Sequence, residues 1–209
     1  MRNVTRLLQC ALLLTIALLS ASAHSASKTI LVLGDSLSAE YGLSRGSGWV
    51  ALLEKRIQEA NIEAEIVNAS ISGETTSGGR SRLPALLQRH RPDIVILELG
   101  ANDGLRGLTL ASAEANLKAM VADAQKSGAK VLLVGMQIPP NYGRDYASKF
   151  ASMFGKVAKD TKAALAPFLL EGVATDPQLF QADRIHPTSA AQPKMLDNVW
   201  PYLKPMLVK

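Results

Sequence analysis

A serine near the start of the chain stands where a nucleophile could be presented. Ser36 follows a run of four apolar residues in the stretch "ILVLGDSLSAEYG", directly after Gly34 and Asp35. A hydroxyl at the end of a strand can attack a carbonyl carbon if a base takes its proton. Asp and Ser between a strand and a helix are also common cap and turn residues. Taken alone, the tripeptide favours a structural role for Ser36.

The chain has three histidines, and one of them is free for chemistry. His24 lies at the expected end of a leader, and His90 lies in "QRHRPD", where a basic helix end suits the helix dipole. His186 lies in "DRIHP", three residues after Asp183. A single bend can therefore bring the carboxylate to one imidazole nitrogen and fix the tautomer. A surface Asp–His pair in a loop is the structural alternative.

Two further residues could donate hydrogen bonds to a developing anion. Gly73 lies in the polar stretch "NASISGETTSGG" with Gly78 and Gly79, and Asn102 lies in "GAND" directly after an apolar run. The glycines are also typical of a flexible turn that needs positive φ, and Asn often bonds its own backbone in turns. Their functional interpretation is a backbone N–H and a side-chain amide at the same sheet edge.

Together these groups match the needs of acyl transfer. They offer a hydroxyl nucleophile, an imidazole base oriented by a carboxylate, and N–H donors for an oxyanion. The G-x-S-x-G elbow of the α/β-hydrolases is absent here, because Ser38 stands where its second glycine should be. A different hydrolase fold is indicated.

The chain resembles the SGNH (GDSL) hydrolases in all four of their sequence blocks. The matching segments are, in the same order, "GDSLS", Gly73, "GANDGLRG" and "DRIHP", and they span nearly the whole chain after the leader. The resemblance implies that Ser36 is the nucleophile, His186 its base and Asp183 the carboxylate that orients the base. It also implies an oxyanion hole formed by the backbone N–H groups of Ser36 and Gly73 with the amide of Asn102.

The loops "GANDGLRG" and "PPNYGRDY" resemble most closely an exported bacterial subgroup of acyl-CoA thioesterases, lysophospholipases and arylesterases. This resemblance implies hydrolysis of small-molecule acyl esters and thioesters, with no metal and no cofactor. It also implies an acyl-chain site lined by Leu105, Leu108, Leu110, Tyr142 and Tyr146. One departure is Arg184, where glycine is common in the subgroup. This arginine adds positive charge beside the expected site.

Short apolar runs alternate with amphipathic stretches, which predicts βα units and a parallel sheet. The expected strands are Thr29 to Leu33, Glu65 to Asn68, Ile94 to Leu99, Val131 to Gly135 and Phe168 to Leu170. The expected helices are Gly48 to Ala60, Gly78 to His90, Ser112 to Lys126, Ala147 to Leu165 and Ser189 to Val208, the last interrupted at its prolines. We expect one three-layer α/β/α domain, flavodoxin-like, with a mainly parallel five-stranded sheet. Each candidate residue then follows the carboxyl end of a strand, where such sheets bind ligands.

The first 23 residues have the layout of a cleavable secretory signal. Two arginines precede an apolar run that is too short for a stable membrane anchor, and Ala21-Ser22-Ala23 offers a small-x-small cleavage pattern. We therefore expect a periplasmic domain over residues 24–209. Cys10, the only cysteine, leaves with the leader, so neither a disulfide nor a thiol nucleophile is expected.

Loss of the leader lowers the formal charge from +5 to +3, because Arg2 and Arg6 leave and no acidic residue does. The remaining chain has no block of like charges and no interleaved aromatic and basic residues, so a nucleic-acid partner is not indicated. The sequence also gives no sign of an obligate protein partner.

Two other functions remain open. The first is a flavodoxin-like module whose loops at Ser36 and Thr75 to Gly79 bind a phosphate or nucleotide at helix N-termini. It leaves His186 and Asn102 without a role, and no nucleotide-binding fingerprint is present. The second is an SGNH deacetylase acting on acetylated sugars, which the apolar stretch Leu105 to Leu110 disfavours.

Overall fold

Five parallel strands form a single sheet in the order β2-β1-β3-β4-β5. The structure is a computed structural model that describes residues 27–208. The strands are β1 (Lys28–Gly34), β2 (Ala64–Asn68), β3 (Ile94–Glu98), β4 (Lys130–Val134) and β5 (Ala164–Ala166). The predicted α/β fold with a five-stranded parallel sheet is confirmed.

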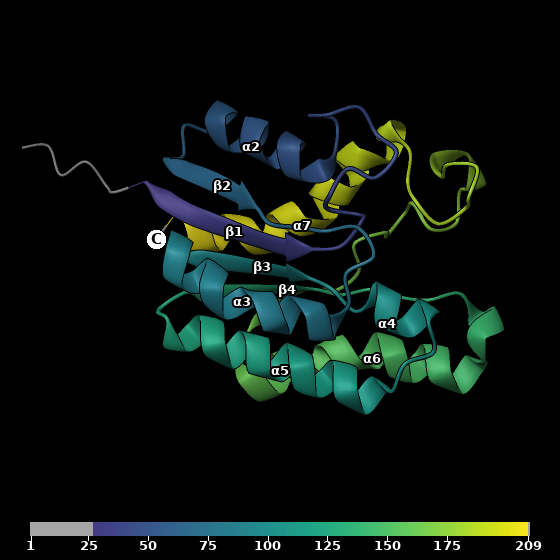
Figure 1. Cartoon of the computed structure of the whole chain (residues 1–209). Coiled ribbons are helices and arrows are strands. Elements are labelled where there is room, and N and C mark those ends of the chain that lie inside the picture. The colour runs from purple at the N-terminus through teal and green to yellow at the C-terminus, as the bar shows by residue number, and fades with distance from the viewer. Residues whose placement is uncertain (1–26, 209) are drawn as a thin grey trace, which may run out of the picture.

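Helices cover both faces of the sheet. They are α2 (Trp49–Glu59), α3 (Thr76–His90), α4 (Ala101–Leu105), α5 (Leu110–Lys126), α6 (Arg144–Thr161) and α7 (Gln192–Leu207). The helices α3, α5 and α6 lie side by side on one face, while α2 and α7 pair on the other (Figure 1). The connections at the carboxyl ends of the strands lie together at the right of that view.

The central strands carry the core. Every residue of β3 is buried, as is the β1 segment from Ile30 to Gly34. Nearly continuous apolar sequence is typical of parallel strands covered on both faces. The register pairs Gly34 with Glu98, so the segments after β1 and β3 leave the sheet beside one another. This pairing brings the "GDSLS" and "GAND" stretches together.

The prediction of the last strand is wrong. The strand is β5, the three residues Ala164–Ala166, and not Phe168 to Leu170. The helix predicted over Ala147 to Leu165 is also wrong at its end: α6 is Arg144–Thr161 and stops before β5, because Lys162 adopts a left-handed conformation with φ of 58°. The Phe168 to Leu170 segment is a turn after Pro167, and its leucines are buried in the core.

Two further helix predictions need correction, and one helix is not predicted by the sequence. Helix α3 begins at Thr76, capped by the Thr75 hydroxyl, so Gly78 and Gly79 are helical and not part of a flexible turn. Helix α7 runs through its two interior prolines, Pro201 and Pro205, without interruption, since its apolar positions are buried along the whole length. The short helix α4 was not predicted, and it contains Asn102.

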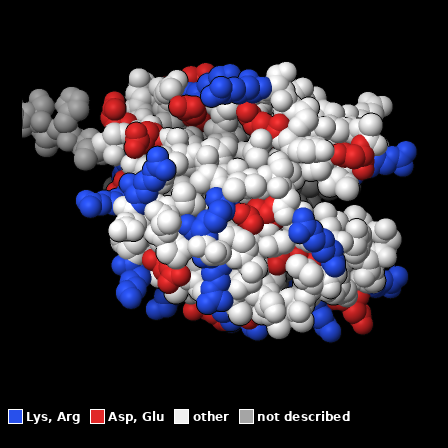
Figure 2. All heavy atoms as spheres, in the orientation of Figure 1, with Lys and Arg blue, Asp and Glu red and all other residues white. Residues whose placement is uncertain are grey.

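Charges are mixed over the surface in view. Figure 2 shows Lys and Arg side chains interspersed with Asp and Glu on this face, without one continuous basic area. Within residues 27–208, no helix has the length and hydrophobicity needed to cross a membrane. The predicted leader, residues 1–23, lies outside the described residues.

Candidate active site

Ser36 lies in a turn that no helix follows directly. The next helix, α2, begins at Trp49 and has Gly48 as its N-cap. The turn is held by Asp35, whose backbone carbonyl accepts hydrogen bonds from the N–H groups of Ser38 and Ala39. The Asp35 carboxylate also accepts one from the N–H of Leu37 at 3.0 Å. Ser36 is therefore not a helix cap, and its hydroxyl is free for another partner.

That partner is His186. The Ser36 Oγ lies 2.9 Å from His186 Nε2, and His186 Nδ1 lies 2.7 Å from Asp183 Oδ2. The backbone N–H of His186, its imidazole and the N–H of Ile185 all donate to Asp183 and lower the pKa of this carboxyl to about 2. Because the carboxylate stays ionised, it accepts from Nδ1–H, which leaves Nε2 free to accept the serine proton. The structure brings these three residues together, as the sequence predicts.

The base is held by a short loop that closes on itself. Gln181 N–H donates to the carbonyl of His186 at 2.8 Å, and the Gln181 amide donates to the carbonyls of Tyr41 and Pro187. The Tyr41 ring lies against the imidazole, with centroids 4.3 Å apart. Gln181 and Tyr41 were not singled out in the sequence. Both lie near the motifs, but they hold the loop of His186 through an amide and a ring face, contacts that no sequence pattern indicates.

Two backbone N–H groups that the sequence assigns to the oxyanion hole have no acceptor in the described chain. Among the described residues, neither the N–H of Ser36 nor that of Gly73 donates a hydrogen bond. Gly73 has φ of +78°, a conformation that a side chain would strain, and its carbonyl accepts from Arg106 Nη2 at 2.9 Å. The positive φ expected of Gly73 is present.

The Asn102 amide is already engaged in the protein. Its Nδ2 donates to Asp35 Oδ2 and to the carbonyl of Glu74, both at 3.0 Å. These bonds fix the amide beside Ser36 and hold the nucleophile turn against α4. An oxyanion would have to share one of these two hydrogens.

A buried pair of carboxyls lies behind the nucleophile. Glu98 Oε2 accepts from the Ser38 hydroxyl at 2.7 Å and from the Asp35 N–H at 3.3 Å, and its Oε1 is buried without a hydrogen-bond partner in the described chain. Burial raises the pKa of Asp35 to about 6. Burial and the neighbouring Asp35 charge raise the pKa of Glu98 well above its ordinary value. The raised pKa favours the protonated form of Glu98, and its hydrogen bonds tie the nucleophile turn to β3.

An apolar cavity of about 580 Å³ opens onto Ser36 and His186. Its apolar walls include Leu105, Ile138, Phe168, Leu170, Phe180 and Ile185. Most of these residues follow the ends of β3, β4 and β5, the segments where the fold places ligands. Within the described chain, no group of three His, Cys, Asp or Glu residues is arranged to hold a metal ion.

The structure brings one of the five predicted acyl-chain residues to this cavity. Leu105 lines it, whereas Leu108, Leu110, Tyr142 and Tyr146 do not. Leu108 and Tyr142 are exposed, Leu110 packs against the core, and the Tyr146 hydroxyl donates to the Leu108 carbonyl at 2.9 Å. The contacts with Ile138, Phe168 and Phe180 were missed, because an apolar residue after a strand gives no sign of which way it points.

Comparison with known proteins agrees with this geometry. Residues 32–192 match the model of the GDSL-like Lipase/Acylhydrolase family. The chain is 52% identical to a Pseudomonas aeruginosa protein named Esterase TesA, over 92% of this chain and 96% of that protein. It is 43% identical to the Escherichia coli K12 protein named Thioesterase 1/protease 1/lysophospholipase L1, over 88% of this chain and 86% of that one. A crystal structure of TesA superposes with a TM-score of 0.85 at 53% identity, covering 86% of this chain and all of that one.

Proposed function

Because the chain belongs to the GDSL-like Lipase/Acylhydrolase family of ester-hydrolysing enzymes, the SGNH hydrolases, we propose that it hydrolyses acyl esters and thioesters through an acyl-enzyme on Ser36. The observation that carries this proposal is the hydrogen-bonded chain from Ser36 Oγ through His186 to Asp183 at the mouth of an apolar cavity. A binding module would leave this chain without a role, whereas a sugar deacetylase would use the same three residues and differs in its substrate.

In the proposed reaction, His186 Nε2 takes the Ser36 proton as Oγ bonds to the acyl carbonyl carbon. Asp183 stabilises the imidazolium that forms, because its carboxylate remains ionised at 2.7 Å from Nδ1. The imidazolium then gives its proton to the departing alcohol or thiol as the tetrahedral intermediate collapses. Water repeats the sequence on the acyl-enzyme, with His186 as the base, and releases the acid.

The negative charge of the tetrahedral intermediate needs donors that water would otherwise supply. We assign this role to the N–H groups of Ser36 and Gly73, which have no acceptor among the described residues, and to the Asn102 amide. Fixed donors of this kind stabilise charge that develops in the transition state. The amide joins by sharing the hydrogen that it gives to Glu74 or to Asp35.

The cavity favours substrates with an apolar acyl chain. Its leucine, isoleucine and phenylalanine walls bury hydrocarbon, and acyl transfer to Ser36 requires the carbonyl to lie at the polar end. Lysophospholipids, acyl thioesters and aryl esters share this shape. The E. coli relative carries thioesterase and lysophospholipase in its name, which supports the same classes here.

A hydrolysis panel tests the proposal. Wild-type protein and Ser36→Ala are assayed on an aryl ester, an acyl-CoA thioester, a lysophospholipid and acetyl-xylan. We expect turnover of the first three by wild type and none above background by the variant. Release of acetate from acetyl-xylan alone would assign the site to sugar deacetylation. Binding of a flavin or nucleotide without any turnover would favour a binding module.

We also propose that the enzyme is exported and loses its leader. The arginines, apolar run and Ala21-Ser22-Ala23 of the N-terminal segment support this. The N-terminus of protein recovered from the periplasm should lie near His24. An intact Met1 on periplasmic protein would contradict the proposal.

A further inference from the structure

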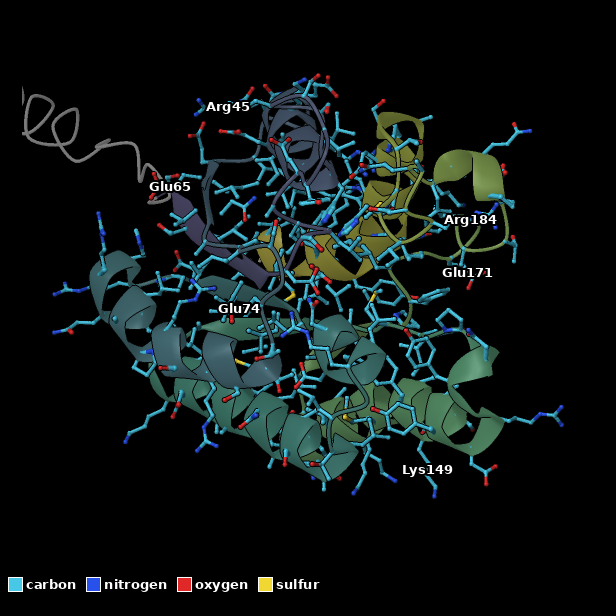
Figure 3. All side chains as sticks on the ribbon, turned by 45° about the vertical axis from the view of Figure 1, so that its right-hand side comes forward. Arg45, Glu65, Glu74, Lys149, Glu171 and Arg184 are labelled. Carbon is cyan, nitrogen blue, oxygen red and sulfur yellow. The ribbon has the colours of Figure 1, made fainter. Side chains whose placement is uncertain are left out.

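Arg184 stands between the residues of the proposed triad. It follows Asp183 and precedes His186 by two positions, and it lines the cavity that opens onto Ser36. Figure 3 shows it at the right of the molecule, on the segment between β5 and α7. Its side chain is exposed, and its guanidinium forms no hydrogen bond or ion pair with any described residue. Glu171, labelled near it in Figure 3, forms no ion pair with it.

The backbone at this position does not call for arginine. Arg184 has φ of +57°, in the left-handed region that glycine enters without strain and other residues enter at a cost. This conformation explains why glycine is common there in the subgroup that the sequence resembles. The local turn does not use the Arg184 side chain, because its hydrogen bond at this position joins two backbone groups, the Arg184 N–H and the Gln181 carbonyl. Any contribution of arginine must come from the guanidinium.

The guanidinium is not neutralised by the carboxylates around it. Both oxygens of Asp183 accept from Ile185 and His186, and Asp35 is buried and bonded to Leu37 and Asn102. Apart from the imidazole of His186, Arg184 is the only basic side chain that lines the cavity in the described chain. It shares this cavity with Ser36, His186 and the apolar walls, which suit an acyl chain but offer nothing to a charged leaving group.

We propose that Arg184 is a specificity-determining residue that binds a phosphate group carried by the leaving group of the substrate. The proposal rests on the proposed function and adds the chemical class of the leaving group. A guanidinium presents a planar fork of N–H donors that matches two phosphate oxygens. The phosphate could belong to the headgroup of a lysophospholipid or to the CoA part of a thioester. Phosphate is the chemistry common to both.

Two matched substrate pairs isolate the phosphate. The first is octanoyl-4′-phosphopantetheine, the phosphorylated arm of the CoA thioester, against octanoyl-pantetheine, which share the acyl chain, the thioester and the pantetheine arm. The second is 1-octanoylglycerol 3-phosphate against 1-octanoylglycerol, each below its micellar concentration. The variant is Arg184→Gly, which removes the charge and relieves the left-handed strain. Arg91→Gly is the control, because Arg91 is also exposed and left-handed, with φ of 44°, but caps α3 at the opposite end of the sheet.

For Arg184→Gly we expect kcat/KM to fall about 3- to 10-fold on a phosphorylated substrate, mainly through KM, as befits one exposed charged contact. The neutral partner should stay within about twofold. Arg91→Gly should change neither. The loss should shrink in 0.5 M NaCl, because salt screens an exposed charge pair. An effect confined to one substrate pair identifies the source of the phosphate. The thermal unfolding midpoint of Arg184→Gly should equal or exceed that of wild type.

Equal losses on phosphorylated and neutral substrates, or no loss on either phosphorylated substrate, would overturn the proposal for Arg184. The proposed function would survive that outcome, because wild type would still hydrolyse the neutral substrates in a Ser36-dependent way. Failure of wild type to hydrolyse any of the four would instead overturn the proposed function itself.

Discussion

The two halves of the proposed active site are built in opposite ways. The nucleophile turn is fixed by the core, through Glu98 on β3 and the register that pairs Gly34 with Glu98. The base is fixed by its own loop, in which Asp183 is partly exposed, with 38% of its side chain accessible, and bonds residues two and three positions away. One half depends on long-range burial, and the other on short-range hydrogen bonds.

Their carboxyls show the same contrast. Burial raises the pKa of Asp35 to about 6, whereas the N–H donors of the loop lower the pKa of Asp183 to about 2. A carboxylate that accepts several N–H bonds keeps its charge, while a buried one tends to keep its proton. The negative charge that catalysis needs, on Asp183, therefore lies in the loop, and the buried half holds Ser36 in position.

The largest effect should come from breaking the loop half. Asp183→Asn exchanges an acceptor for an amide that can hold the imidazole in the wrong tautomer, so kcat should fall about 10³- to 10⁴-fold with the fold intact. Asp176→Asn is the control, because the Asp176 side chain also accepts a backbone N–H two residues ahead, at 2.9 Å, outside the site. Steady-state kinetics and circular dichroism of both variants test this. A loss below about tenfold for Asp183→Asn would remove its orienting role.

The next effect concerns a donor on the buried half. Asn102→Ala should lower kcat about 10²- to 10³-fold and change KM little, since an oxyanion donor acts when charge has developed. Asn198→Ala is the control, because Asn198 also donates to two carbonyls, those of Leu169 and Glu171, away from the cavity. It should lower stability and leave kcat of the folded protein unchanged. If well-folded Asn102→Ala keeps kcat within about threefold, a loss of only ~0.7 kcal/mol, the oxyanion role is excluded.

A smaller effect should follow at the contact between the two halves. Tyr41 comes from the nucleophile turn, and its ring lies 4.3 Å from the His186 ring. Tyr41→Phe keeps the ring and should hold kcat/KM within about twofold. Tyr41→Ala frees the imidazole to turn away and should lower kcat/KM roughly tenfold, because a small misplacement of a reacting group is costly. Equal activities of the two variants would show that the ring does not position the base.

A different kind of effect, on stability and its pH dependence and not on activity, is expected for the buried carboxyl. The unfolded chain ionises Glu98 near pH ~4.3, while the folded protein keeps the proton to higher pH because its pKa is raised. The free energy by which protonated Glu98 stabilises the folded protein is fully present below about pH 4. It is lost as pH rises, by roughly 1.4 kcal/mol per pH unit while folded Glu98 stays protonated. Glu98→Gln has no proton to lose.

Urea unfolding at pH 5, 7 and 8.5 tests the role of Glu98. The free energy of unfolding of Glu98→Gln should increase relative to that of wild type at each step upward in pH. A constant difference between the two proteins would mean that Glu98 is ionised in the folded state, and the contact with the nucleophile turn would then be made by a buried charge.

The loop half was far easier to predict from the sequence than the buried half. Asp183 and His186 are three residues apart, so their contact is local, and strand ends located Ser36 and Asn102 at one sheet edge. Glu98 could not be recognised, because it ends an apolar strand and bonds Ser38, 60 residues away in the sequence. The sequence of β5, Ala-Leu-Ala, has no strand signature, and its place in the sheet follows from pairing with β4. The direction of the side chains in the loops determines which residues line the cavity. That direction depends on tertiary packing, which no local sequence pattern predicts.

The central claim is that Ser36 is the nucleophile and that His186 activates it. A fluorophosphonate that carries an alkyl chain should add one phosphonyl group per molecule, and peptide mass spectrometry should place it on Ser36. Labelling should be absent in Ser36→Ala and at least about 10³-fold slower in His186→Gln, since an unactivated hydroxyl is a weak nucleophile. A phosphonyl group found on another residue, or labelling of Ser36→Ala at the wild-type rate, would contradict the account.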